Sequence, residues 1–203
     1  MPQGSVLGPI LFLIFINDLP NAIDFFTLLF ADDTTFQIFG PDPKSLFELA
    51  NAELKKAAAW FKSNKLTLNI SKTKYIVFRK PNSKINFANL SLNIENSPID
   101  RIGYDCPEKS FKFVGHHLDE FLNWDCHISH VKNKLSKSNY AIKSTKNILP
   151  LHIRKLLYES MFKSHLEFGI IAWGGVNSTK LKCITNLQKK CIRNLILIQF
   201  SKQ

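Results

Sequence analysis

The chain has 203 residues, 45% of them hydrophobic, and a formal net charge of +11 at pH 7. This size and composition suit a globular protein of one domain, or one domain with a smaller companion, and exclude a disordered or fibrous chain. Fourteen lysines and arginines but only two acidic residues lie between Val131 and Gln203, so the positive charge is confined to the C-terminal part. This asymmetry favours nucleic acid or another polyanion as partner. The alternative is a basic surface without a specific partner.

The spacing of the four cysteines predicts the cellular compartment of the protein and gives no sign of a disulfide framework. Cys106, Cys126, Cys183 and Cys191 show no C-x-x-C spacing, so we expect free thiols in a reducing, intracellular protein, nuclear or cytoplasmic. The apolar run from Val6 to Ile16 is shorter than the roughly 20 residues that cross a bilayer. We therefore expect no membrane partner.

The N-terminal half predicts a mixture of helices and strands. A helix beginning at Ser5 or Gly8 is expected to run to about residue 18 and to end at Leu19-Pro20. The short apolar runs 25–30 and 34–39 flank Ala31-Asp32-Asp33, which predicts a β-hairpin with carboxylates at its turn.

A second helix is expected from Ser45 to about Lys62. Ser45 and Glu48 have the spacing of a capping box, and apolar residues follow at helical intervals. Residues 66–70 and 74–78 are predicted as two strands or as one bent strand, and 111–115 as a short strand. A further hairpin is predicted to pair 90–94 with 99–102.

The pattern becomes wholly helical near residue 120. Apolar residues four, three, four and seven apart from Trp124 onward predict a helix that ends at Leu149-Pro150. Two more helices are expected at 152–168 and 178–198, separated by Gly174-Gly175. The sequence thus predicts an α+β region at 1–118 and an all-helical region at 119–203.

The adjacent carboxylates Asp32 and Asp33 are the leading candidates for chemistry. Two neighbouring negative charges repel each other unless a cation lies beside them. Phosphoryl and nucleotidyl transfer use carboxylates in this way, to hold divalent metals that activate a hydroxyl and stabilise the leaving group. The alternative is a solvated Asp-Asp turn, which is what most such pairs are.

Two other local patterns suggest weaker candidates. The turn Gln3-Gly4-Ser5 precedes a helix, where a glycine lets the backbone approach a ligand and the helix N-terminus favours phosphate. An ordinary turn is the alternative. His116-His117 and Cys126-His127 with His130 could suggest a zinc site, and Cys126 and His130 are spaced as an i, i+4 pair. Because no second pair occurs at finger spacing, we expect surface or half-buried side chains here instead of a zinc site.

Four separated motifs occur in an order that is typical of one family. They are Pro2-Gln3-Gly4-Ser5-Val6-Leu7-Gly8-Pro9, then Phe30-Ala31-Asp32-Asp33-Thr34, then Leu66-Thr67-Leu68-Asn69-Ile70-Ser71-Lys72-Thr73-Lys74, then Phe111-Lys112-Phe113-Val114-Gly115. The series resembles the reverse transcriptases of non-LTR (LINE-like) retrotransposons, the jockey and CR1 sort in particular. The resemblance covers roughly residues 2–175.

The resemblance implies an RNA-directed DNA polymerase that transfers nucleotides by a two-metal mechanism. It implies a right-hand polymerase palm, an antiparallel sheet with helices, at 1–118, and a helical thumb at 119–203. RNA template, DNA primer and a deoxynucleoside triphosphate would be the partners, and Mg²⁺ the cofactor.

The resemblance also assigns roles to residues. Asp32 and Asp33 are the implied catalytic metal ligands, and Lys72 (or Lys74) would assist departure of pyrophosphate. Nucleotide and template would be bound by Gln3, Gly4, Ser5 and Asn69. The primer grip would comprise Phe111, Lys112, Phe113, Val114 and Gly115.

One departure from the family pattern limits the expected activity. The family requires a further catalytic aspartate, in a Phe-Asp strand upstream of the Gln-Gly turn, and we expect this chain to be N-terminally truncated and inactive alone. Asp18 and Asp24 lie on the wrong side of that turn. Two alternatives remain open: a non-catalytic, basic nucleic-acid-binding remnant of a mobile element, and a pseudogene product without a selected role.

Overall fold

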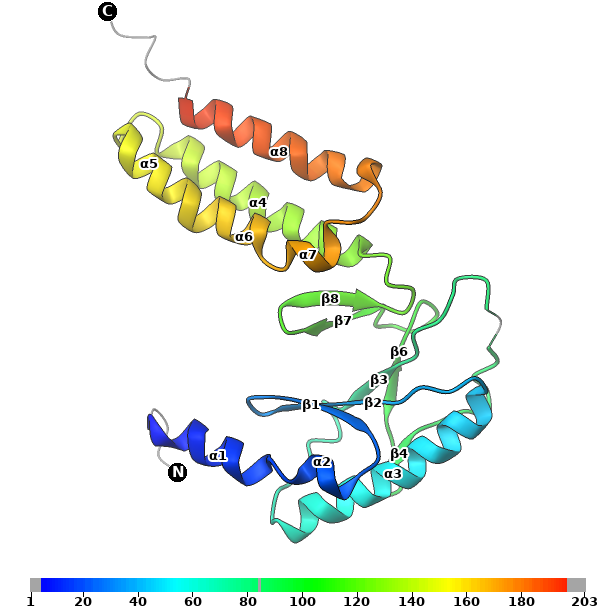
Figure 1. The fold of residues 1–203 in the computed structure, drawn as a ribbon. Helices are drawn as coiled ribbons and strands as arrows, with labels where there is room; N and C mark the ends of the chain where they lie inside the picture. Colours follow the sequence, from blue (N-terminus) through cyan, green and yellow to red (C-terminus); the bar gives the residue numbers. More distant parts are fainter. Residues whose placement is uncertain (1–4, 84, 197–203) are drawn as a thin grey trace, which may run out of the picture. The chain divides into compact units, whose positions relative to one another are not determined.

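A computed structural model of the chain describes residues 5–83 and 85–196. The chain forms two compact units (Figure 1). The first comprises residues up to Tyr75 together with Asn82–Arg101, and the second comprises Ile76–Pro81 and the residues from Ile102 onward. The chain therefore passes between the units at 75–76, 81–82 and 101–102, and the last of these points lies upstream of the predicted boundary at 118–119.

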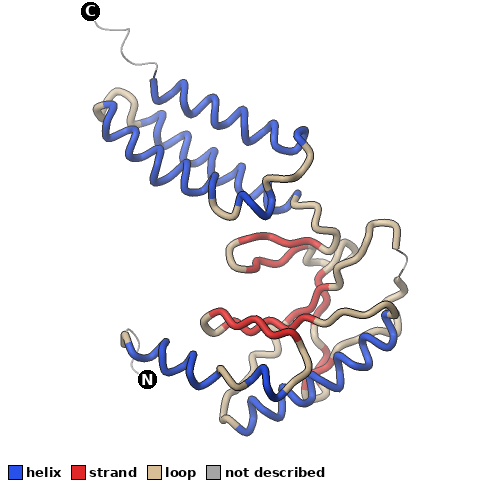
Figure 2. Tube along the Cα trace, viewed as in Figure 1, coloured by secondary structure: helices blue, strands red, loops and turns tan. Residues whose placement is uncertain are grey.

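The first unit combines helices with short β-strands (Figure 2). Its elements are α1 (Leu7–Ile16), α2 (Leu19–Ala22), β1 (Phe26–Phe30), β2 (Asp33–Gln37), α3 (Pro43–Ser63), β4 (Asn93–Ile94) and β5 (Ser97–Pro98). Strands β3 (Lys74–Ile76) and β6 (Asp100–Ile102), where the chain passes between the units, pair with each other.

Helix α3 organises the core of the first unit. One face of the helix is buried, including Phe47, Leu54 and Phe61, and it packs with Leu19 and Phe25. The periodicity that predicted this helix is confirmed, because its apolar residues recur at intervals that place them on one side.

The start of α3 differs from the prediction. The helix begins at Pro43, and the carboxylate of Asp42 accepts a hydrogen bond from the backbone N–H of Ser45 at 2.8 Å. Asp42 is therefore the N-cap, and the predicted capping box of Ser45 and Glu48 is wrong. The Pro at the first helical position favours this earlier start, since its missing N–H needs no partner there.

Three other local predictions for the first unit are also wrong. Leu19-Pro20 begins the short helix α2 instead of ending α1. Residues 66–70 form no strand, although Leu66, Leu68 and Ile70 pack on the core from an extended loop. The hairpin predicted between 90–94 and 99–102 is shorter, because Glu95 and Asn96 both have positive φ and close a two-residue turn between β4 and β5.

The second unit contains one hairpin and a helical layer. Its elements are β7 (Ser110–Phe113), β8 (His116–Asp119), α4 (Asp125–Ser144), α5 (Leu151–Leu157), the π-helical segment η1 (Tyr158–Lys163), α6 (Ser164–Glu167), α7 (Ile170–Trp173) and α8 (Ser178–Ile196). Helices α4 and α8 lie side by side, and the continuous segment α5–η1–α6 packs on α4 (Figure 1).

The helical layer encloses a separate hydrophobic core. Leu135, Ile142, Phe162, Trp173 and Cys191 are almost fully buried in it. Two predicted helices are confirmed as α4 and α8, whereas the third is interrupted by the π-helical turn η1 and ends before Phe168. Strand β8 packs on α4, which explains why the β7–β8 hairpin belongs to this unit.

Candidate functional site

The two candidate metal ligands lie at the turn of the β1–β2 hairpin, as predicted. The antiparallel register pairs Phe30 with Asp33, so Ala31 and Asp32 form the two-residue turn. Ala31 has a φ of 53°, a conformation that a two-residue hairpin turn can require and that costs a non-glycine residue some strain. Asp32 therefore lies in the turn itself, and Asp33 is the first residue of β2.

The hairpin is fixed to the core through one of its faces. Leu29 and Phe36 pack against the core, and the Phe36 ring stacks on Phe25 with centroids 5.3 Å apart. Because successive strand residues point to opposite faces, Asp33 points away from the face that carries Phe36. A short turn on a packed hairpin gives this carboxylate pair a defined position.

The pair has the chemistry of a divalent-metal site. Both aspartates are exposed, and among the residues that the structure describes no Lys or Arg forms an ion pair with either. Mg²⁺ is often held by only one or two carboxylates, with waters or substrate phosphates completing the octahedron. Asp32 and Asp33 fit that role as part of a ligand set. Within the described ranges no group of three or more His, Cys, Asp or Glu residues is suited to hold a metal ion. Cys126 and His130 are therefore not part of such a group.

The segment around Asn69 forms a turn that exposes Lys72. The Asn69 side-chain oxygen accepts hydrogen bonds from the Ser71 hydroxyl at 2.8 Å and from the Lys72 backbone N–H at 3.2 Å. Its carbonyl accepts from the N–H of Thr73 as well. The Asn69 amide oxygen is thus engaged in the turn, whereas the Lys72 side chain lies in solvent and Lys74 is half-buried in β3.

The N-terminal candidates are only partly within the structure. Gln3 and Gly4 lie outside the described residues. Ser5 is half-buried and precedes α1, whose N-cap is Val6 without a side-chain capping bond. The structure therefore brings Asp32 and Asp33 together in one turn and places Asn69 with Lys72 in another; no described hydrogen bond or ion pair joins the two turns.

The segment predicted as the primer grip forms the first strand and the turn of the β7–β8 hairpin. Phe113 pairs with His116, leaving Val114 and Gly115 as a two-residue turn in which both have positive φ, 42° and 86°. Phe111 and Phe113 share one face of β7, and Lys112 is exposed on the other.

Comparison with known proteins identifies the family. The model of the family described as "Reverse transcriptase (RNA-dependent DNA polymerase)" matches residues 1–118. The chain belongs to the reverse transcriptase family. Its mixture of helices and strands is consistent with a reverse transcriptase domain, and the resemblance drawn from the four motifs is confirmed.

The similar curated proteins come from fly mobile elements. The RNA-directed DNA polymerase from mobile element jockey of Drosophila melanogaster is 23% identical over 96% of this chain, and the probable RNA-directed DNA polymerase from transposon X-element is 22% identical over 95%. The jockey protein of Drosophila funebris is 26% identical over 96%. The chain spans about a fifth of the length of these relatives, 21% of each. No solved structure is a significant match.

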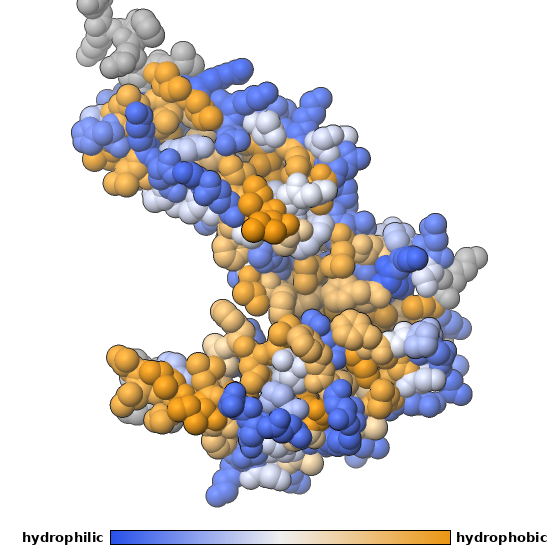
Figure 3. All heavy atoms as spheres, in the orientation of Figure 1, coloured by the Kyte–Doolittle hydropathy of each residue, from blue (hydrophilic) through white to orange (hydrophobic). Residues whose placement is uncertain are grey.

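This reverse transcriptase chain exposes much apolar surface around its candidate site. Helix α1 contains no charged residue, and Ile16 is its only buried residue. Its exposed residues include Leu7, Ile10 and Ile14, the last 68% exposed. Figure 3 shows apolar side chains gathered over α1. On the face of the hairpin that carries Asp33, Phe26 and Phe30 are 58% and 60% exposed.

The helical layer in the second unit of the reverse transcriptase chain carries many basic side chains. The exposed lysines of α4 are Lys132, Lys134, Lys137 and Lys143.

No helix within the described ranges is long and apolar enough to cross a membrane.

The structure places in the core one histidine that the sequence analysis expected at the surface or half-buried. His127 of α4 is 1% exposed, and its ring lies among His116, Trp124 and Trp173. The available signal was its place beside Ile128, at the start of the apolar stripe of that helix. The i, i+4 spacing of Cys126 and His130 suggested metal ligands, whereas the structure packs the neighbouring His127 against Trp124 and Trp173.

Proposed function

We propose that the chain contributes the metal-binding and primer-holding parts of an RNA-directed DNA polymerase. The observation that carries this proposal is the Asp32–Asp33 pair, held at the turn of a core-packed hairpin within the region that matches the family. In this role both carboxylates would hold Mg²⁺, which when bound supplies the charge that activates the primer hydroxyl and stabilises the leaving pyrophosphate.

Lys72 is the proposed cation beside the triphosphate. Its ammonium is exposed, and the turn built by Asn69 holds its backbone. A lysine at this place would offset the charge that builds up on pyrophosphate as it departs. Asn69 would then act by shaping the turn, because its side-chain oxygen already accepts two hydrogen bonds. Gln3, Gly4 and Ser5 remain proposed contacts to nucleotide and template.

The proposed nucleic-acid partners are an RNA template and a DNA primer. The assignment of 1–118 as palm and 119–203 as thumb would place the basic helices on the product duplex, where lysines and arginines displace condensed counterions. The grip on the primer would come from the turn of the β7–β8 hairpin, with Lys112 exposed on it.

The proposed catalytic set needs another carboxylate. A two-metal displacement requires ligands for both ions, and Asp32 with Asp33 supplies one cluster. The family's further aspartate would come from a polypeptide segment that packs over the apolar face of α1 and of Phe26 and Phe30, since these exposed side chains form a surface that a protein partner would bury. The chain alone should therefore have little activity.

A second candidate function is nucleic-acid binding without catalysis. The observation that favours it is the separation of charge: fourteen Lys and Arg but only two acidic residues lie beyond residue 130. Binding to a duplex would then be retained although no nucleotide is added under any condition.

The deciding experiment joins the chain to an upstream reverse transcriptase segment that carries the further aspartate. A hybrid protein would carry the upstream reverse transcriptase segment of a jockey relative fused to residues 1–203, and primer extension on an RNA template would be measured with Mg²⁺. We expect extension by the hybrid and not by the chain alone. Asp32→Asn and Asp33→Asn should each reduce the rate about a hundredfold or more, as losses of transition-state charge stabilisation do.

The matched control for this experiment is Asp18→Asn. Asp18 is an exposed carboxylate between α1 and α2 that makes no side-chain capping bond. Equal loss of extension in this control, or full activity of Asp32→Asn, would reject the proposed metal site.

A further inference from the structure

A buried histidine joins the β7–β8 hairpin to the helical layer. His127 lies in the first turn of α4 and is 1% exposed. Its Nδ1 atom accepts a hydrogen bond from the backbone N–H of His117, in β8, at 3.3 Å. Because an accepting nitrogen carries no proton, the ring is neutral and its proton resides on Nε2.

The surroundings of His127 favour this neutral form. Burial, together with the positive charges of His116, His117, His130 and Lys134, lowers the pKa of His127 to about 4. These groups come from β8 and from α4 itself, and every one is basic. The pKa of His130 is lowered mainly by burial, and the charges of Lys112 in β7 and His165 in α6 contribute to this shift. An added positive charge on His127 would face only repulsion from these neighbours.

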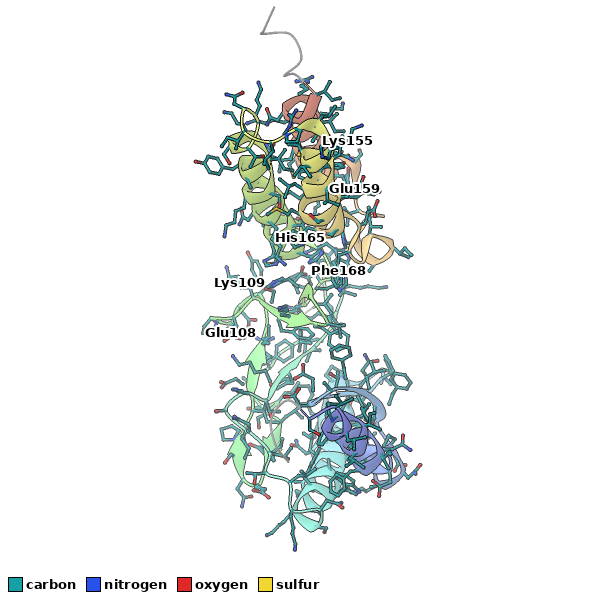
Figure 4. All side chains as sticks on the ribbon, turned by 90° about the vertical axis from the view of Figure 1, so that its left-hand side faces the viewer. Glu108, Lys109, Lys155, Glu159, His165 and Phe168 are labelled. Carbon is teal, nitrogen blue, oxygen red and sulfur yellow. The ribbon has the colours of Figure 1, made fainter. Side chains whose placement is uncertain are left out.

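The tip of the hairpin has its own contact with the helical layer. A Cβ atom at Gly115 would lie 2.7 Å from the Phe168 ring, and one at Gly169 would lie 1.8 Å from Nε2 of His116. The His116 ring stacks on Phe168 with centroids 5.1 Å apart. In Figure 4, Phe168 and His165 lie at the end of the helical layer next to the hairpin.

These contacts are needed because a two-stranded hairpin is only marginally stable alone. Strands β7 and β8 pair with each other and with no other strand in the described part of the chain. We call His127, Phe168 and Gly169 the anchoring cluster. The hairpin takes its orientation from this cluster and not from a larger sheet.

We propose that His127 is a positioning residue, which fixes the β7–β8 hairpin on the helical layer so that the two grip the primer as one body. The structural part of this inference stands on the contacts above. The part that concerns the primer rests on the proposed function. Protonation of Nδ1 would remove the acceptor for the His117 N–H and release strand β8 from α4 at this point.

Two substitutions separate the acceptor from the ring. His127→Asn retains an oxygen acceptor close to the position of Nδ1 and cannot be protonated, whereas His127→Leu has no acceptor. The matched control is His152→Asn, an exposed histidine on α5. Amide hydrogen exchange of His117, corrected for the intrinsic effect of pH, is measured on residues 1–203 without nucleic acid, together with the ¹⁵N shifts of the imidazole.

The expected results differ for each variant. In the parent, protection of the His117 amide should fall about tenfold or more between pH 6 and pH 4, while α4 amides such as that of Leu135 remain protected. His127→Asn should remain protected throughout, and His127→Leu should be unprotected at every pH. The control should match the parent. An Nδ1–H tautomer of His127, or full His117 protection in the leucine variant, would overturn the inference; if the leucine variant fails to fold, the tautomer and the asparagine variant still decide.

The primer-holding part has a separate readout. In the hybrid protein, His127→Leu should raise the Kd for template–primer several-fold, and His127→Asn should restore it. An unchanged Kd despite the lost amide protection would overturn the role in gripping the primer but not the anchoring. Since exchange is measured without nucleic acid, failure of the proposed polymerase function would leave it interpretable.

Discussion

Single residues decide how the functional turns are held. The positive φ of Ala31 allows the tight turn that places Asp32 in the turn and Asp33 at the start of β2. The side chain of Asn69 closes the turn that exposes Lys72. In both places a residue without a proposed catalytic role fixes the position of one that has such a proposed role. The same holds at α3, where Asp42 rather than Ser45 caps the helix.

Removal of the Asp42 cap tests the corrected start of α3. Asp42→Ala should lower the free energy of unfolding by about 1 kcal/mol, because the Ser45 N–H loses its acceptor at the helix end. Glu48→Ala should change it by less than about 0.5 kcal/mol, as expected for a surface residue outside a cap. Urea denaturation measures both. A larger loss from Glu48→Ala would restore the capping box.

Histidine titration should make stability depend on pH. The pKa of His127 lies near 4 in the folded chain, below its ordinary value of 6.5, so its neutral form stabilises the fold above pH 6.5. That contribution, about 3 kcal/mol, should be lost as the pH falls from 6.5 to 4. His117 and His130, whose pKa values are also lowered, act in the same direction. Unfolding curves of the parent and of His127→Asn should diverge over this range; parallel curves would contradict the account.

Among the elements, those determined by local sequence were predicted and those determined by distant contacts were not. The apolar stripe of α3 and the two runs around Asp32 are local patterns, and both elements were found. Residues 66–70 read as a strand because their leucines alternate, but those side chains pack on the core from a loop that has no pairing partner. The π-helical turn η1 and the contact between β8 and His127 arise from packing, which no short window of sequence contains.

The contact between the β7–β8 hairpin and the helical layer makes Gly169 sensitive to substitution. Gly169 has a φ of 60°, and a Cβ there would collide with His116. Gly169→Ala should lower the free energy of unfolding by about 2–4 kcal/mol, from backbone strain plus overpacking. Gly175→Ala is the control, because nothing lies within 4 Å of its would-be Cβ. Thermal unfolding compares the two variants, and equal effects would refute the close contact.

At the scale of the whole molecule, the concentration of positive charge in the C-terminal part can be counted directly from the sequence. The motif order indicated a polymerase and the basic C-terminal part favoured a nucleic-acid partner, and the family comparison confirms the first. The four motifs do not include the further aspartate or the ligands, so the complete metal site could not be predicted from this sequence.

The salt dependence of binding tests the proposed duplex-binding role of the helical layer in the second unit. Binding of the chain to an RNA–DNA duplex should weaken steeply, by about a thousandfold between 50 and 200 mM salt, if about six phosphates are contacted. Lys134→Gln should reduce the slope of log K against log salt by about one, whereas Lys44→Gln, on α3, should leave it unchanged. Fluorescence anisotropy measures the slopes. A flat salt response would remove the support for duplex binding.

The most direct test of the central claim, that Asp32 holds a catalytic metal, is a metal-specificity switch in the hybrid protein. Asp32→Cys replaces a hard oxygen ligand by a thiolate, which binds Mg²⁺ poorly and softer ions well. Primer extension by this variant should be lost in Mg²⁺ and partly recovered when Mn²⁺ or Cd²⁺ is added, and the control Asp18→Cys should show neither effect. Extension in Mg²⁺ at the rate of the unsubstituted hybrid would contradict the claim.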